Sequence, residues 1–168
     1  MTNTETIYHF YESLQARNVE EMLSCYHPSV HFKDPAFGEV IGRRAFYMWR
    51  MLVENMSSDI IIDIDQVFDQ NGKVGCEWTA EYAFGKKKRH IYNKISSRFL
   101  FKDNRIIGHF DFFRFWRWSQ QALGLKGYLF GWSTKMEEMV NAKHNAFLDE
   151  YIAEQRARKV AARDAANK

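Results

Sequence analysis

The apolar positions in the first part of the chain predict two amphipathic helices. The first has the i, i+3, i+4, i+7 spacing of a helix with one buried face, formed by Ile7, Phe10, Tyr11 and Leu14. Thr2 and Glu5 have the pattern of a capping box, which favours a helix start at Thr2. Asn18 and Glu21 repeat this signal before a second stripe of Met22, Leu23 and Tyr26. Because proline disfavours helix in the residue before it, His27-Pro28 is expected to end the second helix.

A short strand and a third helix are predicted next. Residues 30–33 are rich in strand-forming types and lead into the turn sequence Asp34-Pro35-Ala36-Phe37-Gly38. Asp34 therefore lies at a boundary between strand and loop. The third helix begins near Gly42 and places on one side Phe46, Trp49, Leu52, Val53 and Met56. Such a helix is amphipathic, and we expect it to pack against a sheet.

After residue 59 the apolar period changes from about 3.6 to about 2, which predicts a long antiparallel meander. The first strand, residues 60–68, is followed by Asn71-Gly72, a strong hairpin signal. The next strand directs to one face Val74, Cys76, Trp78, Ala80, Tyr82 and Phe84. After the basic loop 85–89, another strand places on one face Asn93, Ile95, Ser97, Phe99 and Phe101. The last strand, within residues 106–116, projects to one face Ile107, His109, Asp111 and Phe113.

Helices followed by a meander predict an α+β fold rather than alternating βαβ units. The length of 168 residues suits one globular domain with a sizeable core. Residues 117–132 predict a short helix and an apolar segment broken by glycines.

A final helix is predicted from Thr134, which has Glu137 at capping-box spacing. Its apolar pattern fades after Ile152, so we expect a solvated end that buries little surface. We therefore predict a globular domain at residues 1–132 and a C-terminal helical extension at residues 133–168.

Charge and composition exclude several classes of protein. The net charge is only +3, and much of the positive charge lies in residues 85–90 and near the C-terminus, so we expect no nucleic-acid partner. Cys25 and Cys76 lie within apolar patterns, as buried free thiols do. The sequence shows neither the basic start and apolar run of a signal peptide nor a stretch of about 20 apolar residues. We therefore expect a cytoplasmic location and no membrane partner.

Candidate chemistry lies on the last strand and in the first turn. His109 and Asp111, two residues apart on one strand face, indicate either a structural hydrogen-bonded pair or part of a working site. Asp34 is either an Asp-Pro turn former or a base. An aromatic pocket raises the pKa of a carboxyl group and a nearby imidazolium lowers it, so Asp34 and His109 are candidates for general acid–base catalysis. His-x-Asp alone is not a specific metal motif, and no GxGxxG or P-loop occurs, so we expect no metal and no organic cofactor.

The segment HFKDPAFG, residues 31–38, together with the two preceding helices and the later hairpins, resembles the nuclear transport factor 2-like superfamily. The resemblance is strongest to its ketosteroid isomerase and SnoaL-like polyketide cyclase branch, and it covers about residues 5–118. It implies a cone-shaped, cystatin-like roll, in which a strongly curved antiparallel sheet wraps around the N-terminal helices. It also implies an apolar cavity open at one end.

Individual positions match the family unevenly. Asp34 falls where ketosteroid isomerases keep their proton-shuttling carboxylate. Phe10, with Tyr11 beside it, and Ser97 stand at the positions of the two oxyanion donors of those enzymes, so these donors are not matched.

Two other branches of the superfamily provide further comparisons. His109 and Asp111 resemble the last-strand acid and base groups of the polyketide cyclases. Epoxide-hydrolase relatives need an Asp-Arg-Asp arrangement, and the nearest arginine, Arg98, has the parity of an outward-facing residue.

The resemblance implies a domain that binds a small hydrophobic molecule, and an isomerase, cyclase or lyase acting on a hydrophobic carbonyl or polyketide-like compound. Asp34 would be the base, His109 its proton partner and Asp111 the group that orients His109. The expected ligand-binding residues are Trp49, Trp78, Tyr82, Asn93, Ser97, Phe99 and Phe113.

A non-catalytic alternative also fits the residues. In it, the chain is a ligand-binding or dimeric assembly module whose cone is filled by its own aromatic side chains, and which acts through the convex face of the sheet and the long C-terminal helix. The family often dimerises through the convex face of the sheet, where Phe110 and Phe112 are expected, so we expect a homodimer through that face. The segment 117–132 is a second candidate cover for it.

Overall fold

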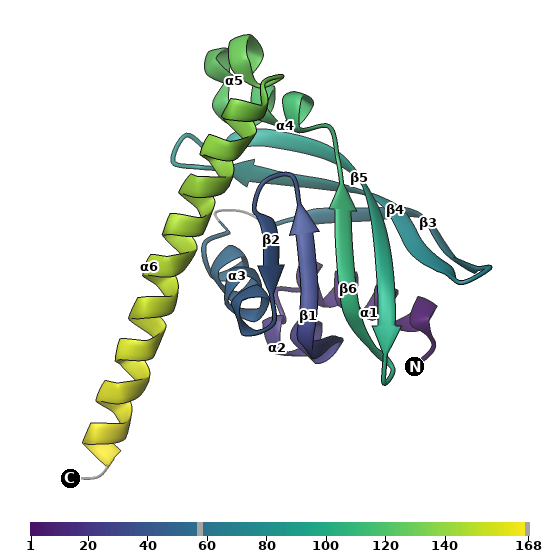
Figure 1. The fold of residues 1–168 in the computed structure, drawn as a ribbon, viewed down its shortest axis with the longest axis vertical. Coiled ribbons are helices and arrows are strands. Elements are labelled where there is room, and N and C mark those ends of the chain that lie inside the picture. The colour runs from purple at the N-terminus through teal and green to yellow at the C-terminus, as the bar shows by residue number, and fades with distance from the viewer. Residues whose placement is uncertain (57–58, 167–168) are drawn as a thin grey trace.

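The α+β prediction is confirmed by the computed structural model, which describes residues 1–56 and 59–166 (Figure 1). Over these residues the helices are α1 (Asn3–Gln15), α2 (Val19–Ser24), α3 (Arg43–Glu54), α4 (Phe115–Leu123), α5 (Leu125–Phe130) and α6 (Thr134–Ala166). The strands are β1 (Tyr26–Asp34), β2 (Gly38–Ile41), β3 (Ile61–Gln70), β4 (Lys73–Phe84), β5 (Arg89–Lys102) and β6 (Arg105–Phe112).

These strands form one curved sheet in the order β2-β1-β6-β5-β4-β3, with α1, α2 and α3 against one of its faces (Figure 1). Neighbouring strands are antiparallel apart from β1 and β6, which run parallel. Their register pairs Phe32 with His109 and Lys33 with Phe110. Because β1 and β6 end at the same edge of the sheet, Asp34 and Asp111 are brought to one place.

Local signals set the ends of the first elements as predicted. Thr2 and Glu5 form the expected capping box on α1, and the Asn18 side chain accepts the N–H of Glu21 at the start of α2. The β3–β4 hairpin turns at Asn71 and Gly72, both with positive φ, as the favoured two-residue hairpin turn requires.

The predicted end of the second helix is wrong. Helix α2 ends at Ser24, and Tyr26 begins β1, four residues before the predicted strand start. The N–H of Ile106 donates to the carbonyl of Cys25, and Tyr26 pairs with Ile106 in the sheet. Pairing with β6 therefore outweighs the helical spacing of Tyr26, so its side chain points into the core from a strand.

A bulge changes which side of β6 faces inward at its start. The β5–β6 register shifts between Leu100, which pairs with Gly108, and Phe101, which pairs with Ile106. The extra residue lets Ile106 take a fully buried position while Ile107 is only partly buried. The prediction that Ile107 shares a face with His109 is therefore wrong, whereas His109 and Asp111 are both buried as predicted.

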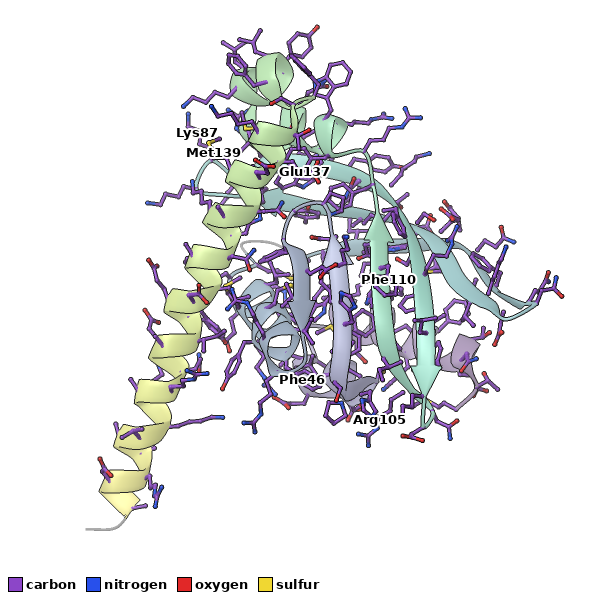
Figure 2. The ribbon with its side chains drawn as sticks, in the orientation of Figure 1. Phe46, Lys87, Arg105, Phe110, Glu137 and Met139 are labelled. Atoms are coloured by element: carbon purple, nitrogen blue, oxygen red, sulfur yellow. The ribbon has the colours of Figure 1, made fainter. Side chains whose placement is uncertain are left out.

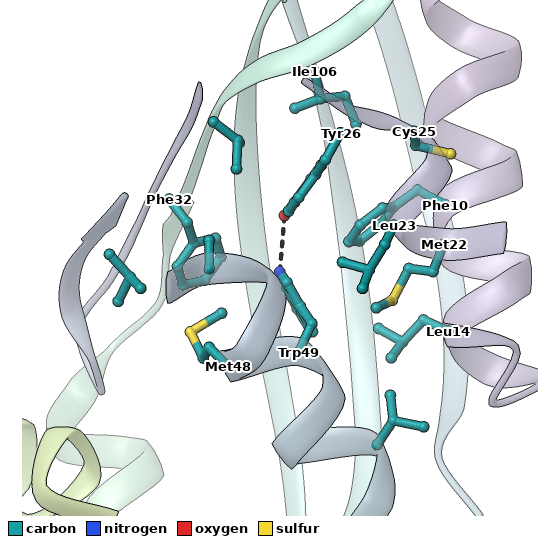
Figure 3. Close-up of a cluster of buried hydrophobic side chains, with 14 of the residues drawn as sticks. Phe10, Leu14, Met22, Leu23, Cys25, Tyr26, Phe32, Met48, Trp49 and Ile106 are labelled. Atoms are coloured by element: carbon teal, nitrogen blue, oxygen red, sulfur yellow. Dashed lines mark hydrogen bonds between the residues drawn. The ribbon is translucent and has the colours of Figure 1, made fainter. Parts of the chain in front are cut away.

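The main core fills the space between the N-terminal helices and the sheet (Figure 3). It is densely aromatic, and its rings meet mostly edge to face, the arrangement favoured by aromatic quadrupoles. A second cluster lies under α4 and the start of α6 and contains Ile91, Phe115, Trp118, Ala122, Met136 and Val140.

Helix α6 runs along the outside of β2 and α3 and continues past the rest of the molecule (Figure 1). Ser133, not Thr134, supplies the side-chain oxygen that accepts the N–H of Met136, so the predicted cap is displaced by one residue. Leu148, Tyr151 and Ile152 join the main core. The described residues beyond Ile152 are almost all exposed, as expected for a solvated helix end.

Candidate functional site

His109 lies at the centre of a buried hydrogen-bond chain. Its Nδ1 is 2.6 Å from the Tyr26 hydroxyl, and its Nε2 is 2.9 Å from Asp111 Oδ1. The Trp49 indole N–H donates to the Tyr26 oxygen at 2.9 Å, a bond drawn in Figure 3. When the imidazole is neutral, the Tyr26 hydroxyl donates to His109 Nδ1, and the His109 Nε2–H donates to Asp111.

A second branch reaches Asp111 from the other side. The Ser97 hydroxyl donates to Asp111 Oδ1. The Ser97 oxygen accepts the Trp78 indole N–H at 2.8 Å and is 3.0 Å from the Tyr11 hydroxyl, which therefore acts as donor. An ionised carboxyl group can only accept, so Asp111 is the terminal acceptor of both branches and fixes their direction. The two indole N–H groups, which can only donate, lie at the outer ends of the network.

Aromatic rings enclose His109 and fill the expected apolar cavity at this point. The ring centroids of Phe99, Phe32 and Phe10 lie 4.5, 5.3 and 5.4 Å from the imidazole centroid. His109 is fully buried and both of its nitrogens are bonded within the protein. In this conformation the imidazole positions Asp111 and has no surface for a substrate.

Asp34 is the turn former that its sequence context suggested, and its carboxyl group also lines a cavity. Its Oδ1 accepts the backbone N–H groups of Ala36 at 3.0 Å and Phe37 at 2.6 Å, so it closes the turn after β1. Burial raises the pKa of the Asp34 carboxyl to about 7, against the two N–H bonds, which lower it. The negative charges of Asp111 and Glu137 raise this pKa further.

Asp34 and Asp111 share a cavity of about 250 Å³ between the ends of β1 and β6 and the start of α6. We call it the Asp34 cavity; its lining consists of Lys33, Asp34, Pro35, Gly38, Phe110, Asp111, Phe112, Glu137 and Asn141. His109 is not among these residues but bonds to one of them, Asp111. The structure thus joins Asp34 to Asp111 by a common cavity, and Asp111 to His109 by a hydrogen bond.

A larger, open cavity of about 530 Å³ lies along β5 and the segment that leads into α4. Three of the predicted ligand-binding residues line it, namely Trp78, Asn93 and Phe113. Charged side chains of both signs also contribute, among them Glu77, Lys94, Arg114 and Arg117.

The other predicted ligand-binding residues line neither cavity. The hydrogen-bond network around His109 includes Trp49 and Ser97, and Phe99 is one of the aromatic rings that surround His109. The Tyr82 hydroxyl accepts the Trp118 indole N–H at 3.0 Å, next to the second core cluster. Burial raises the pKa of Tyr82 to about 12, and the charge of Asp34 adds to this rise.

Helix α6 holds the Asp34 turn through three side chains on one helix face. Asn141 Nδ2, His144 Nδ1 and Asn145 Nδ2 donate to three successive carbonyls, those of Pro35, Ala36 and Phe37, at 2.7, 3.0 and 2.8 Å. We call this set of bonds the α6 latch. Burial lowers the pKa of His144, which favours the neutral imidazole with its proton on Nδ1.

Sequence reasoning missed Tyr26, Tyr11 and the α6 latch as parts of the site. Tyr26 had the spacing of a helical core residue, and nothing local marks its strand. The latch had a visible signal, because positions 141, 144 and 145 share one face of a helix. Its partners, however, are backbone carbonyls more than 100 positions earlier, which no local pattern identifies.

Arg98 points away from the Asp34 cavity, as its parity predicted. Its Nη1 donates to Ser96 Oγ at 2.8 Å, and its guanidinium lies over the Phe68 ring. Asp34 and Asp111 therefore form no Asp-Arg-Asp arrangement with Arg98.

Within residues 1–56 and 59–166, no group of three or more His, Cys, Asp or Glu residues is arranged to hold a metal ion. Among the described helices, none is both long and apolar enough to cross a membrane.

Comparisons with solved structures find the same fold in several proteins. An LEH-like epoxide hydrolase from M. tuberculosis matches with a TM-score of 0.62 and 17% identity, over 76% of this chain and 94% of that chain. A putative SnoaL-like polyketide cyclase from Shewanella putrefaciens matches with a TM-score of 0.61 and 11% identity, over 72% and 85%. TerC, co-crystallised with polyporic acid, matches with a TM-score of 0.58 and 18% identity, over 67% and 92%. At these identities the likeness is one of fold.

A comparison with curated proteins gives no significant match. The sequence profile of the SnoaL-like domain matches residues 7–109, which span α1 to the middle of β6 and include Asp34 and His109. Because this match covers more than half of the chain, the chain belongs to the SnoaL-like domain family.

Proposed function

We propose that the protein binds a small hydrophobic carbonyl compound in the Asp34 cavity and that Asp34 transfers a proton on it, as an isomerase, cyclase or lyase would. The observation that carries the proposal is the pKa of about 7 of a carboxyl group in the cavity wall. A general acid–base group works best when its pKa is near the working pH. The similarity in fold to a putative SnoaL-like polyketide cyclase supports a polyketide-like substrate.

In the proposed reaction, ionised Asp34 removes a proton from the carbon next to a carbonyl group. The electron pair of the broken C–H bond moves to the carbonyl oxygen and gives an enolate, and protonated Asp34 later returns the proton to carbon. Lys33 is the only cation among the described lining residues, and its ammonium group lies 3.5 Å from Glu39, so it would have to turn from this ion pair toward the cavity to stabilise the enolate charge.

Asp111 and His109 have supporting roles in this proposal. Burial is the main cause of the raised pKa of Asp34, and the charge of Asp111 raises this pKa further. The bonds from His109 and Ser97 hold Asp111 in place at the cavity wall. His109 is therefore a positioning residue that acts through Asp111.

The test is proton exchange on a hydrophobic ketone such as β-tetralone, followed by proton NMR in heavy water. We expect the protein to accelerate exchange at the carbon next to the carbonyl, and Asp34→Asn to reduce the acceleration by about 10²- to 10⁴-fold. Asparagine keeps the oxygen that accepts the turn N–H groups, so the variant should fold. The matched control is Asp63→Asn, an exposed carboxylate on β3.

Two results would count against the proposal. One is the absence of any acceleration across a panel of hydrophobic ketones. The other is an acceleration that Asp34→Asn and Asp63→Asn reduce equally, because the exchange would then not depend on the cavity carboxyl.

A non-catalytic assembly role is the second candidate, and a specific observation favours it. The interior around His109 is filled by the protein's own aromatic rings, and the convex face of the sheet leaves Leu100 56% and Phe112 58% exposed. In this proposal a second copy covers that face. Light scattering should then give a dimer that Leu100→Lys dissociates, and a monomeric wild type would rule the interface out.

A further inference from the structure

Helix α5 reverses the usual distribution of large and small residues. Its small residue Gly127 and the following Gly131 are buried, whereas its large apolar side chains face solvent (Figure 2). Leu125 is 72% exposed and Trp132, just after the helix, is 69% exposed. The exposed set, which we call the apolar tip, is Leu125, Tyr128, Leu129, Phe130 and Trp132.

The two glycines explain why this orientation is fixed. A Cβ at Gly127 would lie 1.9 Å from the Ser119 carbonyl oxygen, and one at Gly131 would lie 1.9 Å from Ser119 Oγ. Helix α5 therefore sits directly on α4 along its glycine face, and a side chain on that face has no room. The large residues are directed outward by close packing of the backbone.

Basic residues predominate next to the apolar tip, although Glu137 and Glu138 follow at the start of α6 and Glu81 bonds to His90 at 3.1 Å. Residues 85–90 and 112–136 contain four Lys or Arg residues each, eight together, and no Asp or Glu. The two segments meet in space, because an added Cβ at Gly124 would come within 2.6 Å of the Arg89 guanidinium. The β4–β5 loop, which leads into Arg89, exposes three lysines, Lys86, Lys87 and Lys88.

We propose that the apolar tip and the adjacent lysines dock the protein on the surface of an anionic phospholipid membrane. Tryptophan and tyrosine favour the boundary between lipid and water, and lysine or arginine near the surface is attracted by anionic headgroups. Clusters of large exposed apolar side chains often mark interaction surfaces. The sequence led us to expect no membrane partner. The proposal differs from that expectation because the exposure of the apolar tip depends on how α5 packs on α4, which no sequence pattern shows.

The position of the tip in the molecule fits a surface contact. Helix α5 forms one extremity, and the C-terminal end of α6 lies at the opposite one (Figure 1). A flat surface can therefore reach α5 without contacting the sheet. The charge pattern favours lipid over a second copy of the chain, since two tips facing each other would bring the exposed lysines of one copy close to those of the other, namely Lys86, Lys87 and Lys88.

The experiment measures partition onto vesicles by flotation at low salt. We expect the wild type to bind vesicles of phosphatidylcholine with about 30% phosphatidylserine, and to bind pure phosphatidylcholine far less. Replacing Lys86, Lys87 and Lys88 by glutamine should weaken binding on the order of 100-fold. The double variant Phe130→Ser/Trp132→Ser should weaken it about 10- to 100-fold.

Matched controls distinguish an effect at the apolar tip from a general effect of losing positive charge or exposed apolar surface. Replacing Arg156, Arg158 and Lys159 by glutamine removes the same charge from the exposed end of α6, and Ile61→Ser/Leu100→Ser removes exposed apolar residues from the sheet. Both controls should bind like the wild type, and circular dichroism should show all variants folded.

Three results would overturn the proposal. The first is no binding to the anionic vesicles, and the second is binding that the tip variants and the controls weaken equally. The third is a dimer in solution that Phe130→Ser/Trp132→Ser dissociates, since the tip would then be covered by a second copy. None of these outcomes depends on proton transfer by Asp34.

Discussion

At the scale of single residues, Asp34 is the group whose behaviour follows most directly from its surroundings. Its side chain closes a turn and lines a cavity beside two other carboxylates, Asp111 and Glu137. The turn was visible in the sequence as an Asp-Pro pair. The neighbouring carboxylates were not, because they come from β6 and α6.

The raised pKa of Asp34 predicts how stability changes with pH. The folded state keeps the Asp34 proton up to about pH 7, whereas the unfolded chain releases it near the ordinary value of 3.8. The contribution of Asp34 to the free energy of unfolding is therefore full below about pH 4 and is lost as the pH rises through 7. The loss is at most about 4 kcal/mol, and smaller because Asp34 is only partly buried.

Urea unfolding at several pH values checks this prediction. The difference in unfolding free energy between wild type and Asp34→Asn should change in favour of the variant as the pH rises from about 4 to about 7. The same series on Asp63→Asn provides the baseline. A constant difference across this range would mean that the folded-state pKa of Asp34 is not raised.

The network around His109 predicts a cost for removing one hydroxyl. Tyr26→Phe leaves the Trp49 indole N–H and His109 Nδ1 without their buried partner. We expect a loss of about 1–3 kcal/mol in the free energy of unfolding, with little change for Tyr8→Phe, whose side chain is exposed. Equal stability of the two variants in urea would show that the hydroxyl of Tyr26 is not needed in the network.

At the scale of elements, the sequence predicted those that local signals define. Thr2, Asn18 and the Asn71-Gly72 turn each act within a few residues of chain, and each does what its type predicts. Tyr26 was misplaced because its spacing suits a helix while its partner Ile106 is 80 positions away. The bulge at Ile107 is likewise a property of the β5–β6 pair, not of either strand alone.

The α6 latch predicts a change in the motion of the Asp34 turn. Asn145→Ala removes the hydrogen bond to the Phe37 carbonyl, which is worth about 1 kcal/mol. The amides of Ala36 and Phe37, which donate to Asp34, should then exchange with heavy water about fivefold faster. Lys143→Ala, an exposed change on the same helix, should leave both rates unchanged.

Amide exchange followed by NMR gives both rates in one experiment. Unchanged exchange of Ala36 and Phe37 in Asn145→Ala would mean that the other bonds of the latch hold the turn alone. The sequence predicts a globular domain at residues 1–132 and a helical extension at residues 133–168. Opening of the α6 latch without unfolding of the sheet would support this division.

At the scale of the whole molecule, α6 belongs to the core over only part of its length. Leu148 is fully buried in the main core, whereas the described residues after 155 are all exposed. We therefore expect removal of residues 156–168 to change the free energy of unfolding by less than about 0.5 kcal/mol. Leu148→Ala should cost about 2–5 kcal/mol.

Thermal and urea unfolding of the two variants distinguish these cases. A large loss of stability on truncation would show that the exposed end of α6 has a partner in solution. The sequence predicted that the apolar face of this helix ends after Ile152, because the pattern of residue types shows where apolar residues stop recurring. It did not predict how firmly the first half is attached, since that depends on the carbonyls of the Asp34 turn.

The family membership and the curved sheet were predictable, whereas the sequence left open whether the cone is hollow or filled by its own aromatic side chains. The resemblance implied a cavity inside the cone, and the structure instead places aromatic rings around His109 and an opening beside Asp34. Whether a cone is filled depends on how side chains such as Phe10, Phe32 and Phe99 pack together. No periodicity in the sequence contains that information.

The proposed function depends on Asp34 being a carboxyl group that gains and loses its proton near neutral pH. The most direct measurement is a carbon NMR titration of the Asp34 carboxyl in the wild type and in Asp111→Asn. We predict a pKa of about 7 in the wild type, and a lower value in Asp111→Asn because a neighbouring negative charge has been removed. A wild-type pKa close to the ordinary 3.8 would rule out proton transfer by Asp34 near neutral pH, and Asp34 would then be only a turn residue.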